Sequence, residues 1–125
     1  MSNLGPFQQK WVDALRSGKY KQGKNALRTE NDEFCCLGVL EDVMGTPCVK
    51  GGIGLVQTIR GNKYAYHHSK TDFSIGVLTR KTYEDLKITN RGQTKLIDMN
   101  DSGASFDEIA DFIENNYDFM FVEAV

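Results

Sequence analysis

Apolar residues recur at helical spacing near the start of the chain. The stretch begins at Pro6, which suits the first turn of a helix, and stops before Gly18, which suits a helix C-cap. We therefore predict a helix over residues 6–17. Its apolar face consists of Phe7, Trp11, Ala14 and Leu15.

A second helical pattern lies near the end of the chain and predicts a helix over residues 105–116. Ser105 and Glu108 have the S-x-x-E spacing of a capping box, in which each side chain bonds the other residue's backbone N–H. The apolar run Leu96–Met99 is expected to be extended, and the polar turn Asn100–Gly103 follows it. The apolar face of the helix consists of Phe106, Ile109, Phe112 and Ile113.

The region after the first helix favours short strands. Residues 25–29 are expected to form a strand, residues 30–33 a turn, and residues 34–36 the second strand of a hairpin. Residues 37–44 then fit a short helix that Gly45 ends. Short apolar runs fit strands and helices alike, so helix remains an alternative for the whole of 34–44.

The middle of the chain is β-like over residues 46–69. Tyr64, Tyr66 and His68 alternate with other residues, as in a half-buried strand. A helix over residues 78–86 should follow, with Thr79 as its N-cap. Within 46–69 we expect a glycine turn at 51–54, a strand at 55–59 and a hairpin turn at 61–62.

This order of elements predicts an α+β fold for residues 1–125, which we interpret as one domain. We expect an antiparallel sheet of short strands, packed by about three to four helices. The tail at 117–125 is unusually aromatic, so it should pack on the body or on a second subunit. On this basis we also expect a homodimer.

The net charge of −2 hides an asymmetry along the chain. Residues 10–28 carry a net charge of +5, and residues 98–125 carry −8. Either the two segments lie together and compensate, or they form a basic face for anions and an acidic face for a partner. An acidic chain with one basic segment is a poor candidate for sequence-specific DNA binding.

The cysteines and histidines do not have the spacing of a metal site. Cys35, Cys36 and Cys48 match no zinc pattern, and His67 and His68 are far from them in sequence. We expect no metal, no cofactor and no disulfide, with all three thiols reduced in a cytoplasm. No membrane span or signal peptide is expected.

The segment 17–24 is the best candidate for binding an anion. It combines glycines, lysines and backbone amides, which suit an oxyanion, and Tyr20 could stack on a base. The polar turn at 100–103 lies beside a helix N-terminus, where sites are often built. The candidate ligand-binding residues are Lys19, Tyr20, Lys21, Gln22, Lys24, Arg28, Tyr66, Asn100, Asp101 and Ser102.

Other chemistries fit the sequence less well. Residues 98–108 echo a calcium-binding loop, but the bidentate glutamate falls one residue early and the cap explains Ser105 and Glu108 without a metal. Cys35 and Cys36 lie among apolar residues and are expected to pack in the core. We therefore expect no catalytic residues, with a small hydrolase using His67 or His68 as an alternative.

Three blocks of the chain, residues 11–28, 34–40 and 99–113, carry a resemblance. They read WVDALRSGKYKQGKNALR, FCCLGVL and MNDSGASFDEIADFI. In combination they resemble a family of small proteins of unassigned activity that is frequent in tailed-phage genomes. That family usually has L-C-D where this chain has Leu40-Glu41-Asp42. The resemblance implies a phage gene product that acts in the bacterial cytoplasm and is dispensable for building the virion.

Two functions compete for such an accessory protein. In the first, it binds or sequesters a small nucleotide-like anion, for instance a signal of host defence, on the segment 18–24. In the second, it docks on a host protein through its acidic C-terminal helix and aromatic tail.

Overall fold

The computed structural model describes residues 4–29, 31–50, 64–69, 71–74 and 76–122. These ranges contain six helices and an antiparallel sheet, so the predicted α+β class is confirmed, with more helices than the expected three to four. None of the described helices is long and apolar enough to cross a membrane. The elements are α1 (Pro6–Arg16), β1 (Lys21–Gln22), β2 (Glu33–Phe34), α2 (Cys36–Val43), β3 (Cys48–Lys50), β4 (Tyr64–Ser69), β5 (Asp72–Ser74), α4 (Arg80–Asp85), α5 (Asn90–Asp101), α6 (Phe106–Asn115) and α7 (Tyr117–Met120).

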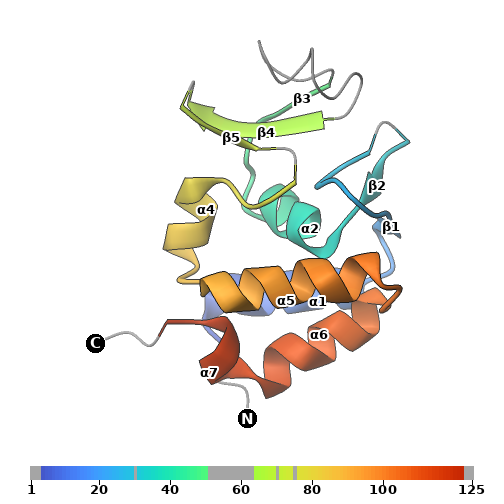
Figure 1. The fold of residues 1–125 in the computed structure, drawn as a ribbon, viewed down its shortest axis with the longest axis vertical. Coiled ribbons are helices and arrows are strands. Elements are labelled where there is room, and N and C mark those ends of the chain that lie inside the picture. The colour runs from blue at the N-terminus through green and yellow to red at the C-terminus, as the bar shows by residue number, and fades with distance from the viewer. Residues whose placement is uncertain (1–3, 30, 51–63, 70, 75, 123–125) are drawn as a thin grey trace.

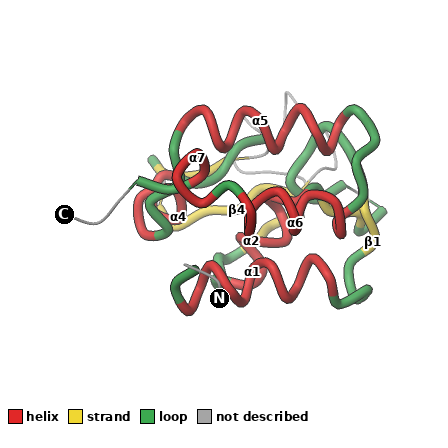
Figure 2. The backbone as a smooth tube through the Cα atoms, turned by 90° about the horizontal axis from the view of Figure 1, so that it is seen from below, coloured by secondary structure: helices red, strands yellow, loops and turns green. Residues whose placement is uncertain are grey.

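The helices pack around one hydrophobic core. Helices α2 and α6 lie on opposite sides of α1 and α5, and the sheet lies beyond α2 (Figure 1). Seen from below, α6 runs between α1 and α5 (Figure 2). Trp11 is fully buried at the centre, and its indole N–H donates to the Cys36 carbonyl at 2.9 Å. This bond satisfies the one polar atom of the largest core side chain.

The strands form two separate sheets. Strands β3, β4 and β5 are antiparallel neighbours in that order, whereas β1 pairs in parallel with β2. The predicted strand at 25–29 is wrong, because only Arg28 pairs, as an isolated antiparallel bridge to Phe34. Its neighbours Ala26 and Leu27 are buried in the core, and Asn25 has a left-handed backbone with φ of 67°.

The strand–helix junction at 34–36 lies earlier than predicted. Strand β2 ends at Phe34, and Cys35 is the N-cap of α2, with its sulfur accepting a hydrogen bond from the Gly38 N–H at 3.4 Å. Cys36 therefore belongs to the helix rather than to the strand. The side chain of Cys35 supplies an acceptor that a helix start needs.

The prediction of an extended run at Leu96–Met99 is also wrong, because these residues lie inside α5. The side chain of Thr89 accepts from the Gly92 N–H and caps the helix. Gly92, Leu96 and Asn100 are spaced by four and are all buried, so one helical face enters the core. A buried polar residue and a buried glycine on that face obscure its apolar periodicity in the sequence.

The C-terminal tail packs on the body of its own chain as far as Val122. Met120 and Phe121 are buried, and Phe121 forms a β-bridge with Ile88. Backbone hydrogen bonds join Thr89 N–H to the Met120 carbonyl at 2.8 Å and Val122 N–H to the Lys87 carbonyl at 2.6 Å. The tail therefore needs no second subunit to bury these two side chains, and self-association stays a prediction.

Some predicted features lie outside the described residues, namely the glycine turn at 51–54, the strand at 55–59 and the hairpin turn at 61–62. The strand predicted around Tyr66 is confirmed as β4, and β5 was not predicted. The helix capped by Thr79 is confirmed as α4, with the Thr79 hydroxyl accepting from the Thr82 N–H.

Candidate functional site

The structure brings the segment 17–28 and the C-terminal end of α5 together. The Gln22 side chain donates to the Asn100 Oδ1 atom at 2.9 Å and to the Ala104 carbonyl at 2.7 Å. The Asn100 Nδ2 atom donates to the Gly23 carbonyl at 2.8 Å, and its Oδ1 atom accepts from the Cys36 N–H at 3.3 Å. Asn100 is fully buried, and its hydrogen bonds link β1, α2 and α5 within the core.

This arrangement settles how Gln22 and Asn100 use their polar atoms. Both were candidate ligand-binding residues, and both make hydrogen bonds within the protein. The sequence predicts that Asn100 or Asp101 bonds backbone amides near the turn. Both do bond backbone amides, but these belong to Cys36 and Asn25, far away in sequence.

Asp101 lies at the wall of a cavity of about 280 Å³. Its Oδ1 atom accepts from the Asn25 N–H at 3.2 Å, which supports the left-handed backbone of Asn25. The wall is mostly apolar, and Asp101 is the one acidic side chain among the lining residues. Those residues are Asn25, Ala26, Cys35, Gly76, Val77, Ile97 and Asp101.

The lysines of the predicted anion site lie on the adjacent segment. Lys19, Lys21 and Lys24 are all exposed, and Lys24 directly precedes Asn25 of the cavity wall. Lys21 forms an ion pair with Glu33 at 3.4 Å. Lys19 and Lys24 form no ion pair with any residue in the described part of the chain. Two of the three cations are therefore available to an anion.

Tyr20, Arg28 and Tyr66 do not line the cavity. The Tyr20 hydroxyl donates to the Asp42 carboxylate at 2.5 Å, and its ring meets the Phe34 ring edge-on at 5.0 Å. Arg28 lies over the same Phe34 ring and bonds Asp32 at 2.8 and 3.0 Å. These contacts already occupy the Tyr20 hydroxyl and part of the Arg28 charge.

Tyr66 is the most deeply buried of the candidate residues that carry an ionisable group. It is 1% exposed, and its hydroxyl makes no hydrogen bond to a described residue. Burial raises its pKa far above that of an exposed tyrosine. Burial also raises the pKa of Tyr20, to about 12, with the Asp42 carboxylate as a further cause. Both phenols are therefore neutral near pH 7.

Cys35, which lines the cavity, and its buried neighbour Cys36 are poor nucleophiles. Burial raises the pKa of Cys35 to about 11, and it raises the pKa of Cys36 as well. A thiol must ionise before it attacks, so these two groups are inert near pH 7. This agrees with the prediction that they are packing residues.

We expect iodoacetamide to modify Cys48 first in the folded protein at pH 8, because Cys48 is only partly buried. Cys35 and Cys36 are buried, so they should react only when the protein unfolds and far more slowly than Cys48. Mass spectrometry of timed samples measures each site, and a Cys48→Ala variant should show almost no fast labelling. Rapid modification of Cys35 or Cys36 in the folded protein would contradict their burial.

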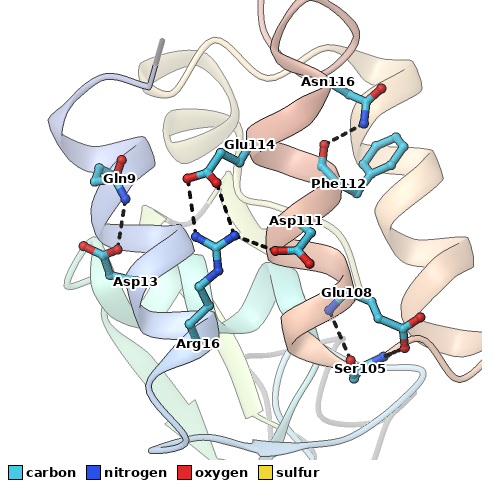
Figure 3. A network of polar contacts seen from close by, with 9 residues as sticks. All are labelled: Gln9, Asp13, Arg16, Ser105, Glu108, Asp111, Phe112, Glu114 and Asn116. Atoms are coloured by element: carbon cyan, nitrogen blue, oxygen red, sulfur yellow. Dashed lines mark hydrogen bonds and ion pairs between the residues drawn. The ribbon is translucent and has the colours of Figure 1, made fainter. Parts of the chain in front are cut away.

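Ser102 and Ser105 flank the turn after α5. Ser102 is the exposed C-cap of α5, and Ser105 is the N-cap of α6. The predicted capping box is confirmed, with Ser105 Oγ accepting from Glu108 N–H and Glu108 Oε1 accepting from Ser105 N–H, both at 3.1 Å (Figure 3). No group of three or more metal-ligating side chains occurs in the described ranges.

Replacing Ser105 with Ala should lower the free energy of unfolding by about 1 kcal/mol, because one backbone N–H of α6 loses its acceptor. Urea denaturation measures the change, and Ser102→Ala is the matched control on the same turn. A rise of several degrees in the melting temperature of the wild type on adding calcium would instead support a metal-binding role for this turn.

The oppositely charged ends of the chain meet where α1 packs on α6. Arg16 bonds Asp111 at 2.6 Å and Glu114 at 3.3 Å, and its guanidinium points between the two carboxylates (Figure 3). This favours the alternative in which the two charged segments compensate each other. His67, the described histidine side chain, is partly buried on β4 and is not among the residues that line the cavity.

Several wall residues of the cavity were missed by the sequence analysis. Ala26, Val77 and Ile97 come from three separate segments and carry no chemical signature. The one available signal was the Asn25 position, since asparagine tolerates a left-handed backbone where the chain turns sharply.

Part of the chain matches a known family model. Residues 6–48 match the model of a domain of unknown function (DUF8296). The match spans α1 through the start of β3 and includes Asn25, Ala26 and Cys35 of the cavity wall. No curated protein and no solved structure is significantly similar to the chain.

Proposed function

We propose that this protein binds a small nucleotide-like anion and withholds it from the host. The observation that carries the proposal is the mostly apolar cavity of about 280 Å³ whose wall continues into the lysine-bearing segment. Ligand sites are typically apolar hollows with a few polar groups that fix orientation. A cavity of this size accommodates a base, and exposed cations beside it suit phosphates.

The arrangement supports binding rather than catalysis. The thiols of Cys35, which lines the cavity, and of its neighbour Cys36 are protonated near pH 7, and Tyr66 is not among the lining residues. A protein that only sequesters a ligand needs shape and charge, without a nucleophile or a general base. Together with the resemblance to phage proteins, this favours an accessory protein that captures a host-defence signal in the cytoplasm of an infected bacterium.

Titration calorimetry with ATP, GTP and a cyclic dinucleotide tests the proposal. At least one should bind the wild type, and replacing Lys19, Lys21 and Lys24 together with Gln should weaken that binding about tenfold or more and reduce its salt dependence. The matched control replaces Lys10, Lys81 and Lys87 with Gln, which removes the same charge elsewhere. An equal loss in both variants, or no binding to the wild type, would refute the proposal.

Docking on a host protein remains a second candidate, supported by a different surface. Phe7 is 50% exposed and Val122 is 55% exposed, and both line a groove of about 270 Å³. The buried Met120 and Phe121 are no longer available to a partner. Native mass spectrometry of protein purified from infected cells separates the two functions, since it shows either a retained small molecule or a co-purified protein.

A further inference from the structure

Asp101 has unused hydrogen-bonding capacity at the cavity wall. Its Oδ1 atom accepts from the Asn25 N–H, whereas its Oδ2 atom bonds no group in the described part of the chain. The side chain is partly buried and is the one acidic group among the lining residues. A carboxylate in such a place favours a ligand that brings hydrogen-bond donors, because an ionised carboxylate can only accept.

The nucleobases differ in what they offer to a carboxylate. Guanine presents N1–H and the N2 amino group side by side, which matches the two oxygens of a carboxylate. Adenine and cytosine place a ring nitrogen acceptor beside their amino group, and uracil places carbonyl oxygens on both sides of its N3–H. Each of these three bases would set an acceptor against Asp101, and an unpaired or repelled polar group in a partly dry site is costly.

We propose that Asp101 makes the cavity selective for guanine nucleotides, an inference that rests on the proposed function. The guanine ring lies against Ala26, Val77 and Ile97, and its N1–H and N2 amino group donate to Asp101. The same carboxylate repels phosphate, so the phosphates point out of the cavity toward the segment with Lys19 and Lys24. Asp101 thus sets both the choice of base and the orientation of the ligand.

GTP, ITP and ATP separate these contributions in titration calorimetry, because ITP differs from GTP only in lacking the N2 amino group. The wild type should bind GTP about tenfold or more tightly than ITP or ATP. In Asp101→Asn one oxygen remains to accept from the Asn25 N–H, so the fold should persist, as urea denaturation can verify. This variant should bind GTP and ITP within about threefold of each other.

The matched control is Asp98→Asn, which removes the same charge from an exposed position on the same helix. It should keep the wild-type preference for GTP. Equal binding of the three nucleotides by the wild type, or equal effects of the two variants, would overturn guanine selectivity and leave the proposed function standing. If none of the three nucleotides binds, both the selectivity and nucleotide capture fail.

Discussion

Replacing Gly38 with Ala should lower the free energy of unfolding by about 3 kcal/mol. Gly38 lies in the first turn of α2, where the helix packs on the backbone of Leu27. A Cβ atom at position 38 would lie 1.7 Å from the Leu27 carbonyl oxygen and 2.6 Å from its carbon. Because backbone cannot rotate away as a side chain can, the helix and the segment 24–28 would have to separate.

That carbonyl is also held in place by a hydrogen bond. The Cys35 N–H donates to it at 3.1 Å, so a shift of Leu27 would break the N-terminal anchor of α2. Urea denaturation measures the effect. Gly76→Ala is the control, because a Cβ atom there meets no atom of the described residues within 4 Å, and it should change stability by less than about 0.5 kcal/mol. A Gly38→Ala protein as stable as the wild type would contradict this close approach.

Gly38 shows what the sequence could and could not predict. The termini of α1, α4 and α6 follow from local signals such as Pro6, Thr79 and the Ser105–Glu108 pair, and the structure has these helices. Capping depends on residues three or four apart, which are visible in the sequence. The reason for a glycine at position 38 depends on Leu27, which is near it only in the fold.

Contacts between residues far apart in the sequence explain the predictions that were wrong. The parallel pairing of β1 with β2 joins residues 21–22 to 33–34 and was not predicted, whereas the predicted antiparallel pairing of 25–29 with 34–36 is present only as the Arg28–Phe34 bridge. At the candidate site, the sequence identified the segments around Lys24 and Asp101 but did not predict that they lie side by side in the fold. The hydrogen bonds of Asn100 that join them depend on a helix where the sequence suggested an extended run.

Glu41 is a buried carboxyl side chain that the sequence did not reveal. It is fully buried on α2, and its two oxygens accept four hydrogen bonds from three threonines. The Oε1 atom accepts from the hydroxyls of Thr46, Thr79 and Thr82, and the Oε2 atom accepts from the Thr79 N–H at 2.6 Å. Glu41 therefore attaches the start of α4 to α2.

Replacing Glu41 with Gln should lower the free energy of unfolding by about 2 kcal/mol or more. Glutamine keeps only one oxygen, so either the Thr79 N–H or the hydroxyls of Thr46 and Thr82 lose the acceptor that Glu41 provides. A buried donor without an acceptor loses its hydration and gains nothing in return. Urea denaturation measures the change, and it should be accompanied by faster hydrogen exchange at the start of α4.

The matched control is Glu84→Gln, the same chemical change at an exposed position on α4, which should alter stability by less than about 0.5 kcal/mol. A Thr82→Val change should cost less in the Glu41→Gln background than in the wild type, because the bond between their side chains is already impaired. Additive effects of the two substitutions would mean that the carboxylate and the Thr82 hydroxyl do not act as one network. Equal stability of Glu41→Gln and wild type would show that α4 is held to α2 by apolar packing alone.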